Sequence, residues 1–211
     1  MLWLLVAISA YFLLAIVALV DKYLISGPIP SPRVYAFYVG GLGILALFLI
    51  PLVNFLIPDT LNILLSLLAG AMDIFGILGL IGALQLFEAS RVVPAIGGIL
   101  PLFTFGLVFL FSGGEEILSF WKILAFVLLI SGSVLITFEK KKIITLKSLQ
   151  IVTLTAFLFS LAFVLSKVVH LAQPFWSGFI WMRIGGFLAA LFFLFSKEVR
   201  EELFKKRVGF K

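Results

Sequence analysis

Seven long apolar segments restrict what this chain can fold into more than any other feature of its sequence. They lie near 2–20, 35–57, 62–86, 92–112, 120–138, 149–169 and 175–196. Each is long enough to cross about 30 Å of hydrocarbon as a helix, at a rise of about 1.5 Å per residue. Helices satisfy their own backbone hydrogen bonds without water, and the alternating pattern of a membrane β-barrel does not occur. The segments therefore predict an all-α fold, a polytopic transmembrane bundle of about seven helices.

The composition agrees with a lipid environment. Charged residues make up 12% of the chain and hydrophobic ones 63%, whereas soluble domains carry about 25% charged residues. The absence of cysteine excludes a disulfide framework, thiol catalysis and zinc–thiolate sites. The first apolar segment lacks the basic start and the cleavage site of a signal peptide, so we interpret it as a membrane helix.

The basic residues are distributed unequally between the two expected sides of the bundle. One side holds only Lys122 and Lys167, while Arg183 lies inside a span. The other side carries the remaining Lys and Arg, which are Lys22, Arg33, Arg91, Lys140, Lys141, Lys142, Lys147, Lys197, Arg200, Lys205, Lys206, Arg207 and Lys211. Because cytoplasmic loops are enriched in Lys and Arg, we expect this side to be cytoplasmic and the N-terminus to lie outside the cell. The net charge of +6 then requires no nucleic-acid partner.

The first two segments resemble the last two. A shift of 145 residues without a gap aligns Phe12-Leu13 with Phe157-Leu158, Lys22 with Lys167, Gly40-Gly41 with Gly185-Gly186 and Phe48-Leu49 with Phe193-Leu194. The copies are five spans apart, and an odd offset inserts the second copy upside down. We therefore predict a partial inverted-topology repeat, an architecture found in many secondary transporters.

Part of the chain resembles a known family. The similarity is carried by ALQLFEASRVVP at 83–94, by Leu100-Pro101, by Gly114-Glu115 and by LLISGS at 128–133. These elements look like an EamA domain of the drug/metabolite transporter superfamily, although a family glycine is replaced by Ala125. Members are similar to two five-helix domains in tandem, with a solute path between the halves, and typically export metabolites, amino acids or drugs.

The resemblance implies a domain organisation with an incomplete second half. It predicts an EamA-like five-helix domain at 1–139, a basic cytoplasmic linker at 140–148, the first two helices of a second repeat at 149–196 and a basic cytoplasmic tail at 197–211. Three helices of a full-length member are missing. Either the chain is a fragment of a longer transporter, or it completes its bundle by pairing as a homodimer.

The fourth apolar segment has the features of a kinked helix. Pro94, Gly97, Gly98 and Pro101 are spaced i, i+3, i+4 and i+7 and so share one face. Pro101 removes an interior backbone hydrogen bond, which predicts a kink. Freed carbonyls are tolerated against protein or a wet cavity, so we expect this face to look inward, either for packing or to line a solute path.

Polar residues within spans are the candidates for substrate binding. Asp73 costs about 2.5 to 3.5 kcal/mol on insertion scales, and Arg183 lies about 12 Å into its helix. Tyr38 is the repeat mate of Arg183, and Gln85 lies in the family-like stretch. We hypothesise that Asp73, Tyr38 and Arg183 approach one cavity bounded by the Pro94–Pro101 face, because a common wet cavity would reduce the desolvation cost of all three.

Taken together, these features favour a membrane transporter, an exporter of small metabolites or drug-like solutes that works by alternating access in the plasma membrane. An alternative is a non-transporting fragment or assembly partner of a longer transporter. A seven-helix receptor would share the helix count, but a retinal-type pigment needs a lysine where the last helix carries Arg183.

Enzyme motifs such as H-E-x-x-H or G-x-S-x-G do not occur, so we expect neither an enzyme nor a cofactor or metal site. The expected partners are the lipid bilayer and a small solute.

Overall fold

The computed structural model describes residues 2–27, 29, 31–111, 120–137 and 146–204. Within these residues it contains eight α-helices and two 3-10 segments, and no strand. Most of the expected linker, the pair Gly114-Glu115 and residues 205–211 lie outside this range. The elements are α1 (Leu2–Ser26), α2 (Pro32–Gly43), η1 (Ile44–Leu52), α3 (Thr60–Leu86), α4 (Ala89–Phe111), α5 (Phe120–Thr137), α6 (Leu146–Ala172), α7 (Phe175–Phe192), η2 (Phe193–Phe195) and α8 (Lys197–Phe204).

The helices have the length and composition of membrane spans. In the described part of the chain, six stretches qualify: Trp3–Ser26, Pro32–Leu52, Thr60–Leu86, Ala89–Phe111, Leu149–Ala172 and Phe175–Phe195. The fifth expected span coincides with α5, in which the apolar stretch Ile123–Gly132 is described. The predicted all-α, polytopic bundle is therefore confirmed, and the chain is a multi-pass membrane protein.

Local sequence explains where the central helices begin. Asp59 caps α3, because its side chain accepts hydrogen bonds from the backbone and the side chain of Asn62. Pro32 is the first residue of α2 and Pro174 directly precedes α7, positions at which proline needs no amide donor. The second span is not uniform, since α2 tightens into η1, which contains Pro51.

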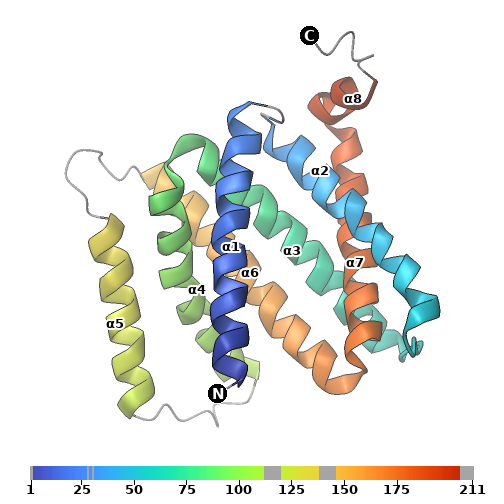
Figure 1. Cartoon of the computed structure of the whole chain (residues 1–211), viewed down its shortest axis with the longest axis horizontal. Helices are drawn as coiled ribbons and strands as arrows, with labels where there is room; N and C mark the ends of the chain where they lie inside the picture. The colour runs from blue at the N-terminus through green and yellow to red at the C-terminus, as the bar shows by residue number, and fades with distance from the viewer. Residues whose placement is uncertain (1, 28, 30, 112–119, 138–145, 205–211) are drawn as a thin grey trace.

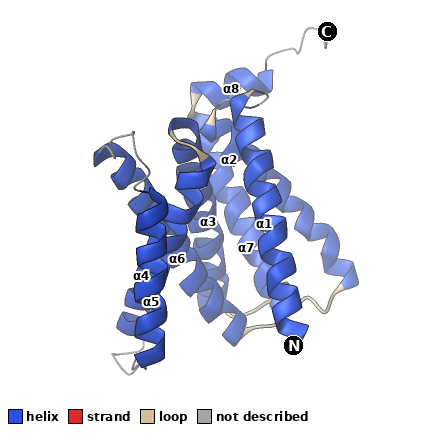
Figure 2. Cartoon of the chain, turned by 60° about the vertical axis from the view of Figure 1, so that its left-hand side comes forward, coloured by secondary structure: helices blue, strands red, loops and turns tan. Residues whose placement is uncertain are grey.

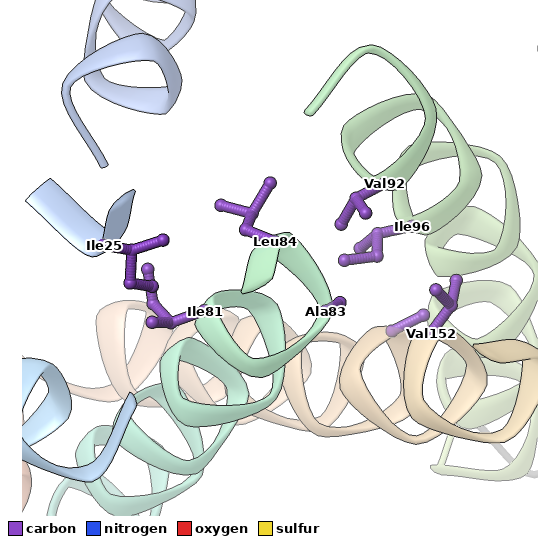
Figure 3. Packing of buried hydrophobic residues seen from close by; sticks show 8 residues of the cluster. Ile25, Ile81, Ala83, Leu84, Val92, Ile96 and Val152 are labelled. Atoms are coloured by element: carbon purple, nitrogen blue, oxygen red, sulfur yellow. The ribbon is translucent and has the colours of Figure 1, made fainter. Parts of the chain in front are cut away.

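Helix α3 is the centre of the bundle. It packs along α6 on one side and along α7 on the other, while α2 packs on α7 (Figure 1). Figure 2 shows α4 and α5 together at one side of the bundle, with α8 at its upper end. The ends of α3, α4 and α6 meet in an apolar cluster where Val92 and Ile96 face Leu84 and Val152 (Figure 3).

The contact between α3 and α7 is a contact between backbones. A Cβ atom added at Gly70 would lie 1.8 Å from the carbonyl oxygen of Met182, and one at Gly185 would lie 2.2 Å from that of Leu67. No side chain fits at such distances. Glycine at these two positions therefore sets how closely the two helices cross, as small residues do in other membrane bundles.

Helix α1 is attached to the bundle near its C-terminal end. Its side chains are exposed along most of the helix, whereas Asp21 and Ile25 are buried. Tyr35 donates a hydrogen bond to Asp21, and the Lys22 ammonium donates to the carbonyls of Leu84 and Phe87 at the end of α3. These polar contacts and the burial of Ile25 against Ile81 and Leu84 therefore hold the C-terminal end of α1 on the bundle.

The start of the expected C-terminal tail is helical and docked. In α8, Val199 is fully buried against the cluster that includes Val34 and Phe193. The Glu198 carboxylate lies 3.2 Å from a guanidinium nitrogen of Arg33 and accepts a 2.7 Å hydrogen bond from Ser31. This segment therefore packs on the beginning of α2.

Candidate functional site

Two charged side chains meet at the middle of the central crossing. Asp73 is the midpoint of α3, and Arg183 is halfway along α7. Nη1 of Arg183 lies 4.0 Å from Oδ2 of Asp73, and the two side chains remain 41% and 30% exposed. The close crossing at Gly70 and Gly185 places both groups on the same side of the helix pair. The structure therefore pairs two of the predicted site residues.

A small cavity adjoins this pair. Its volume is about 40 Å³, enough for water or a small polar group but not for a whole metabolite. It is lined by Val39, Gly40, Gly43, Gly70, Asp73, Ile74, Phe179, Met182, Arg183 and Gly186. Tyr38 is not among the lining residues. The α2 residues that line the cavity are Val39, Gly40 and Gly43. Tyr38 instead lies edge-on to Phe37, with ring centroids 5.9 Å apart.

The immediate surroundings of Arg183 are aromatic. Its guanidinium carbon lies 5.0 Å from the centroid of the Phe179 ring, a cation–π distance. On the same helix, Trp181 stacks on Phe55, with centroids 6.3 Å apart. In the part of the chain that the structure describes, neither Arg183 nor Asp73 makes a hydrogen bond. The guanidinium donors and the carboxylate acceptors therefore remain open to a ligand or to water.

The remaining candidates lie elsewhere. Gln85 is exposed and lies twelve residues beyond Asp73, about 18 Å along α3. Pro94 and Pro101 are half-buried, Gly98 is buried and Gly97 is exposed, so the four residues do not form one uniformly buried face. Next to Pro101, the carbonyl of Leu100 accepts a 2.8 Å hydrogen bond from the buried Ser160 of α6. Here α4 packs on α6, away from the cavity.

A polar network near the start of α7 was not predicted. Gln173 is buried and donates a 2.9 Å hydrogen bond to Ser66, which donates in turn to the carbonyl of Asn62. Ser177 accepts a 2.9 Å hydrogen bond from the amide of Leu56. The first bond joins the connection between α6 and α7 to α3, and the second joins the start of α7 to the loop before α3. Nothing in the spacing of these residues indicated that they would meet.

In the described part of the chain, the ionisable groups that line the cavity are Asp73 and Arg183. Among the described residues, no group of three His, Asp or Glu side chains is placed to hold a metal ion. Outside the spans, the hydrogen bond from the Asn62 side chain holds the pKa of Asp59 below its usual range, which fits its role as a helix cap. Inside the spans, Asp73 and Arg183 present a carboxylate and a guanidinium to the cavity, groups that accept and donate hydrogen bonds.

Comparison with protein-family models, with curated proteins and with solved structures gives no match.

Proposed function

We propose that this protein is a membrane transporter of small solutes, an exporter that works by alternating access, and that the Asp73–Arg183 cavity is its solute site. The observation that carries the proposal is the placement of this pair at the midpoints of two spans, half-exposed beside a cavity. Secondary transporters bind their substrates near the midplane of the bilayer.

The energetic argument rests on what such a pair costs. A charge in a span is expensive, and intramembrane charges are normally paired or face a wet cavity. A pair that served stability alone would be expected to satisfy its donors and acceptors, because partly satisfied buried networks are unfavourable. Asp73 and Arg183 are 4.0 Å apart and partly exposed. An arrangement of this kind supports binding more than it supports packing.

The inverted repeat remains part of this proposal. If α1 and α2 are the first copy, and α6 and α7 the second, then α2 and α7 are repeat mates, and they pack directly on each other. A Cβ atom at Gly40 would lie 2.8 Å from the carbonyl oxygen of Gly186, so the mates approach at the paired glycines. Rocking of one copy against the other across this contact would expose the cavity to each side in turn.

The second half of an EamA-like pair is supplied, in our proposal, by a second copy of the chain. The exposure of α1 supports this, since no residue in its most apolar stretch is buried, whereas 39% are in α6. The same exposure favours the alternative function, an assembly partner that does not transport alone. Dilution of the protein in liposomes separates the two, because flux from a homodimer falls per chain as the protein is diluted.

We further propose that α8 lies in the cytoplasm and the loop before α3 lies outside, as the basic asymmetry indicates. The chain has no cysteine, so single thiols report topology directly. We expect a membrane-impermeant maleimide to label Ile57→Cys but not Glu201→Cys in intact cells, since both side chains are exposed. The opposite labelling would reverse the orientation without affecting the transport proposal.

The decisive experiment is flux. The purified 211-residue chain, reconstituted in liposomes, is loaded with a mixture of impermeant small solutes of positive, negative and zero net charge. Mass spectrometry then follows which solutes leave. We expect at least one to leave faster than from protein-free liposomes, and the Arg183→Gln variant to lose that release. Equal retention of every solute would contradict transport.

A further inference from the structure

We infer that the group that the Asp73–Arg183 cavity recognises is an oxyanion, such as the carboxylate or sulfonate of a small solute, and that Arg183 binds it in competition with Asp73. The inference rests on the proposed function and specifies its substrate class. It follows from three properties of the site: the open donors of Arg183, the loose contact to Asp73, and the size of the cavity.

The first property concerns hydrogen-bond donors. A guanidinium carries five N–H donors and no acceptor, and its planar fork matches two oxygens of an oxyanion. Arg183 contacts Asp73 through one nitrogen at 4.0 Å, beyond hydrogen-bond length, and rests on the Phe179 ring. Its donors therefore have no acceptor among the described residues, while its cavity-facing position makes them reachable.

The second property is the local charge balance. Asp73 and Arg183 are the only ionisable residues that line the cavity among the described residues; α2 contributes Val39, Gly40 and Gly43, and α7 otherwise contributes apolar groups or glycine. An entering anion is attracted by Arg183 and repelled by Asp73. Because the two groups are 4.0 Å apart, beyond hydrogen-bond length, and border a cavity large enough for water, Asp73 holds Arg183 only loosely. An oxyanion that makes two short hydrogen bonds can displace it.

The third property is size. A cavity of about 40 Å³ accommodates a carboxylate or sulfonate group, and the 41% exposure of Arg183 leaves room for the rest of the solute to project outward. Phe179 provides an apolar wall beside the charge. A small aromatic oxyanion therefore suits the site as a probe.

The test measures binding rather than flux. The full chain in lipid nanodiscs is titrated with benzenesulfonate, benzyltrimethylammonium and benzenesulfonamide, and saturation-transfer NMR of each probe gives its dissociation constant. We expect benzenesulfonate to bind more tightly than the cation and the neutral amide. Arg183→Gln should weaken benzenesulfonate binding by about tenfold or more, and Asp73→Asn should strengthen it by about two- to fivefold.

The direction of the Asp73→Asn effect is decisive. A site for a cation or a zwitterion would lose affinity in Asp73→Asn, whereas an oxyanion site in which Asp73 competes gains it. Tighter binding of benzyltrimethylammonium, weaker benzenesulfonate binding in Asp73→Asn, or equal benzenesulfonate binding in Arg183→Gln would each overturn the inference. If the wild type releases cations instead, the oxyanion inference fails but the transport proposal holds. If an oxyanion binds at Arg183 and no solute is released, the transport proposal fails but the oxyanion inference holds.

A steric pair of variants tests the location without changing charge. A Cβ atom at Gly43, which lines the cavity, would make an ordinary contact of 3.7 Å with Cδ of Arg183, so we expect the longer side chain of Gly43→Leu to occupy space beside the Arg183 side chain. A Cβ atom at Gly41 meets nothing within 4 Å, which makes Gly41→Leu the matched control on the same helix. We expect Gly43→Leu to weaken benzenesulfonate binding at least tenfold and Gly41→Leu to leave it unchanged. Equal affinity in both variants would place the oxyanion elsewhere.

Discussion

Two aspartates lie within spans of this protein, and one is hydrogen-bonded between helices whereas the other is not. Asp21 in α1 is buried and accepts a hydrogen bond from Tyr35, while its neighbour Lys22 bonds two carbonyls of α3. Asp73 in α3 is 30% exposed, makes no hydrogen bond in the described part of the chain and faces Arg183 across 4.0 Å. The hydrogen bonds of Asp21 and Lys22 join α1 to α2 and α3, whereas we propose that the open donors and acceptors of Asp73 and Arg183 bind a solute.

The comparison predicts that changes at the two places will have different consequences. Variants at the α1 attachment should lower stability and leave the chemistry of the cavity intact. Variants of the Asp73–Arg183 pair should change the chemistry of the cavity and leave stability nearly unchanged. The Asp73–Arg183 pair depends on the crossing of α3 and α7 at Gly70 and Gly185, whereas the α1 attachment lies at the C-terminal end of α3.

The largest effect is expected at that crossing. Gly70→Ala would bring a methyl group within 1.8 Å of the Met182 carbonyl, so α3 and α7 must separate. We expect a loss of about 3 kcal/mol in the free energy of unfolding, measured by SDS titration in mixed micelles. Gly82→Ala on the same helix meets nothing within 4 Å and serves as the control. Equal stability of the two variants would show that the crossing is looser than described.

The α1 attachment should give the next largest effect. Lys22→Met removes the donor to the Leu84 and Phe87 carbonyls and leaves them without this partner. We expect a loss of about 1 to 3 kcal/mol in the same titration. The repeat mate Lys167 is exposed, so Lys167→Met should change stability by less than about 0.5 kcal/mol. A similar loss of unfolding free energy in Lys22→Met and Lys167→Met would show that the Lys22 hydrogen bonds do not stabilise the α1 attachment.

The charge pair should contribute little to stability. Because the cavity beside Asp73 and Arg183 can hydrate a charge that loses its partner, and the two groups are 4.0 Å apart, we expect Asp73→Asn to change the free energy of unfolding by about 1 kcal/mol or less. The double variant Asp73→Asn/Arg183→Gln should be no less stable than either single variant. If Asp73→Asn lowered the free energy of unfolding more than Lys22→Met does, the pair would have a structural role.

The smallest effect concerns the exposed aspartate at the start of α3. The Asn62 hydrogen bond lowers the pKa of Asp59 in the folded protein, so its contribution is present above the unfolded pKa and is lost as the pH falls through the folded pKa. The thermal midpoint should therefore fall slightly as the pH drops below about 4. The fall should be smaller in Asp59→Asn, which keeps a capping side chain. Identical pH profiles of the thermal midpoint in the wild type and Asp59→Asn would contradict a stabilising contribution from the Asp59 carboxylate.

The sequence predicted the bundle well because each span is a property of local composition. It also predicted Asp73 and Arg183 as candidates, which the structure places 4.0 Å apart, since charges within apolar segments are conspicuous on insertion scales. It did not reveal the α1 attachment, because Asp21 and Lys22 resemble ordinary charges at a helix end. Nor did it separate Tyr38 from Val39 and Gly43, because the side of α2 that faces the cavity depends on the crossing angle with α7.

Flux and stability measured in the same two variants test the proposed solute site most directly. Wild type, Arg183→Gln and Lys22→Met are reconstituted in liposomes, the folded fraction of each is determined, and release of the transported solutes is expressed per folded chain. We predict that Arg183→Gln loses at least about tenfold in release while its unfolding midpoint stays near that of the wild type. Lys22→Met should show the lower midpoint and wild-type release. Wild-type release from folded Arg183→Gln would contradict the assignment of the solute site.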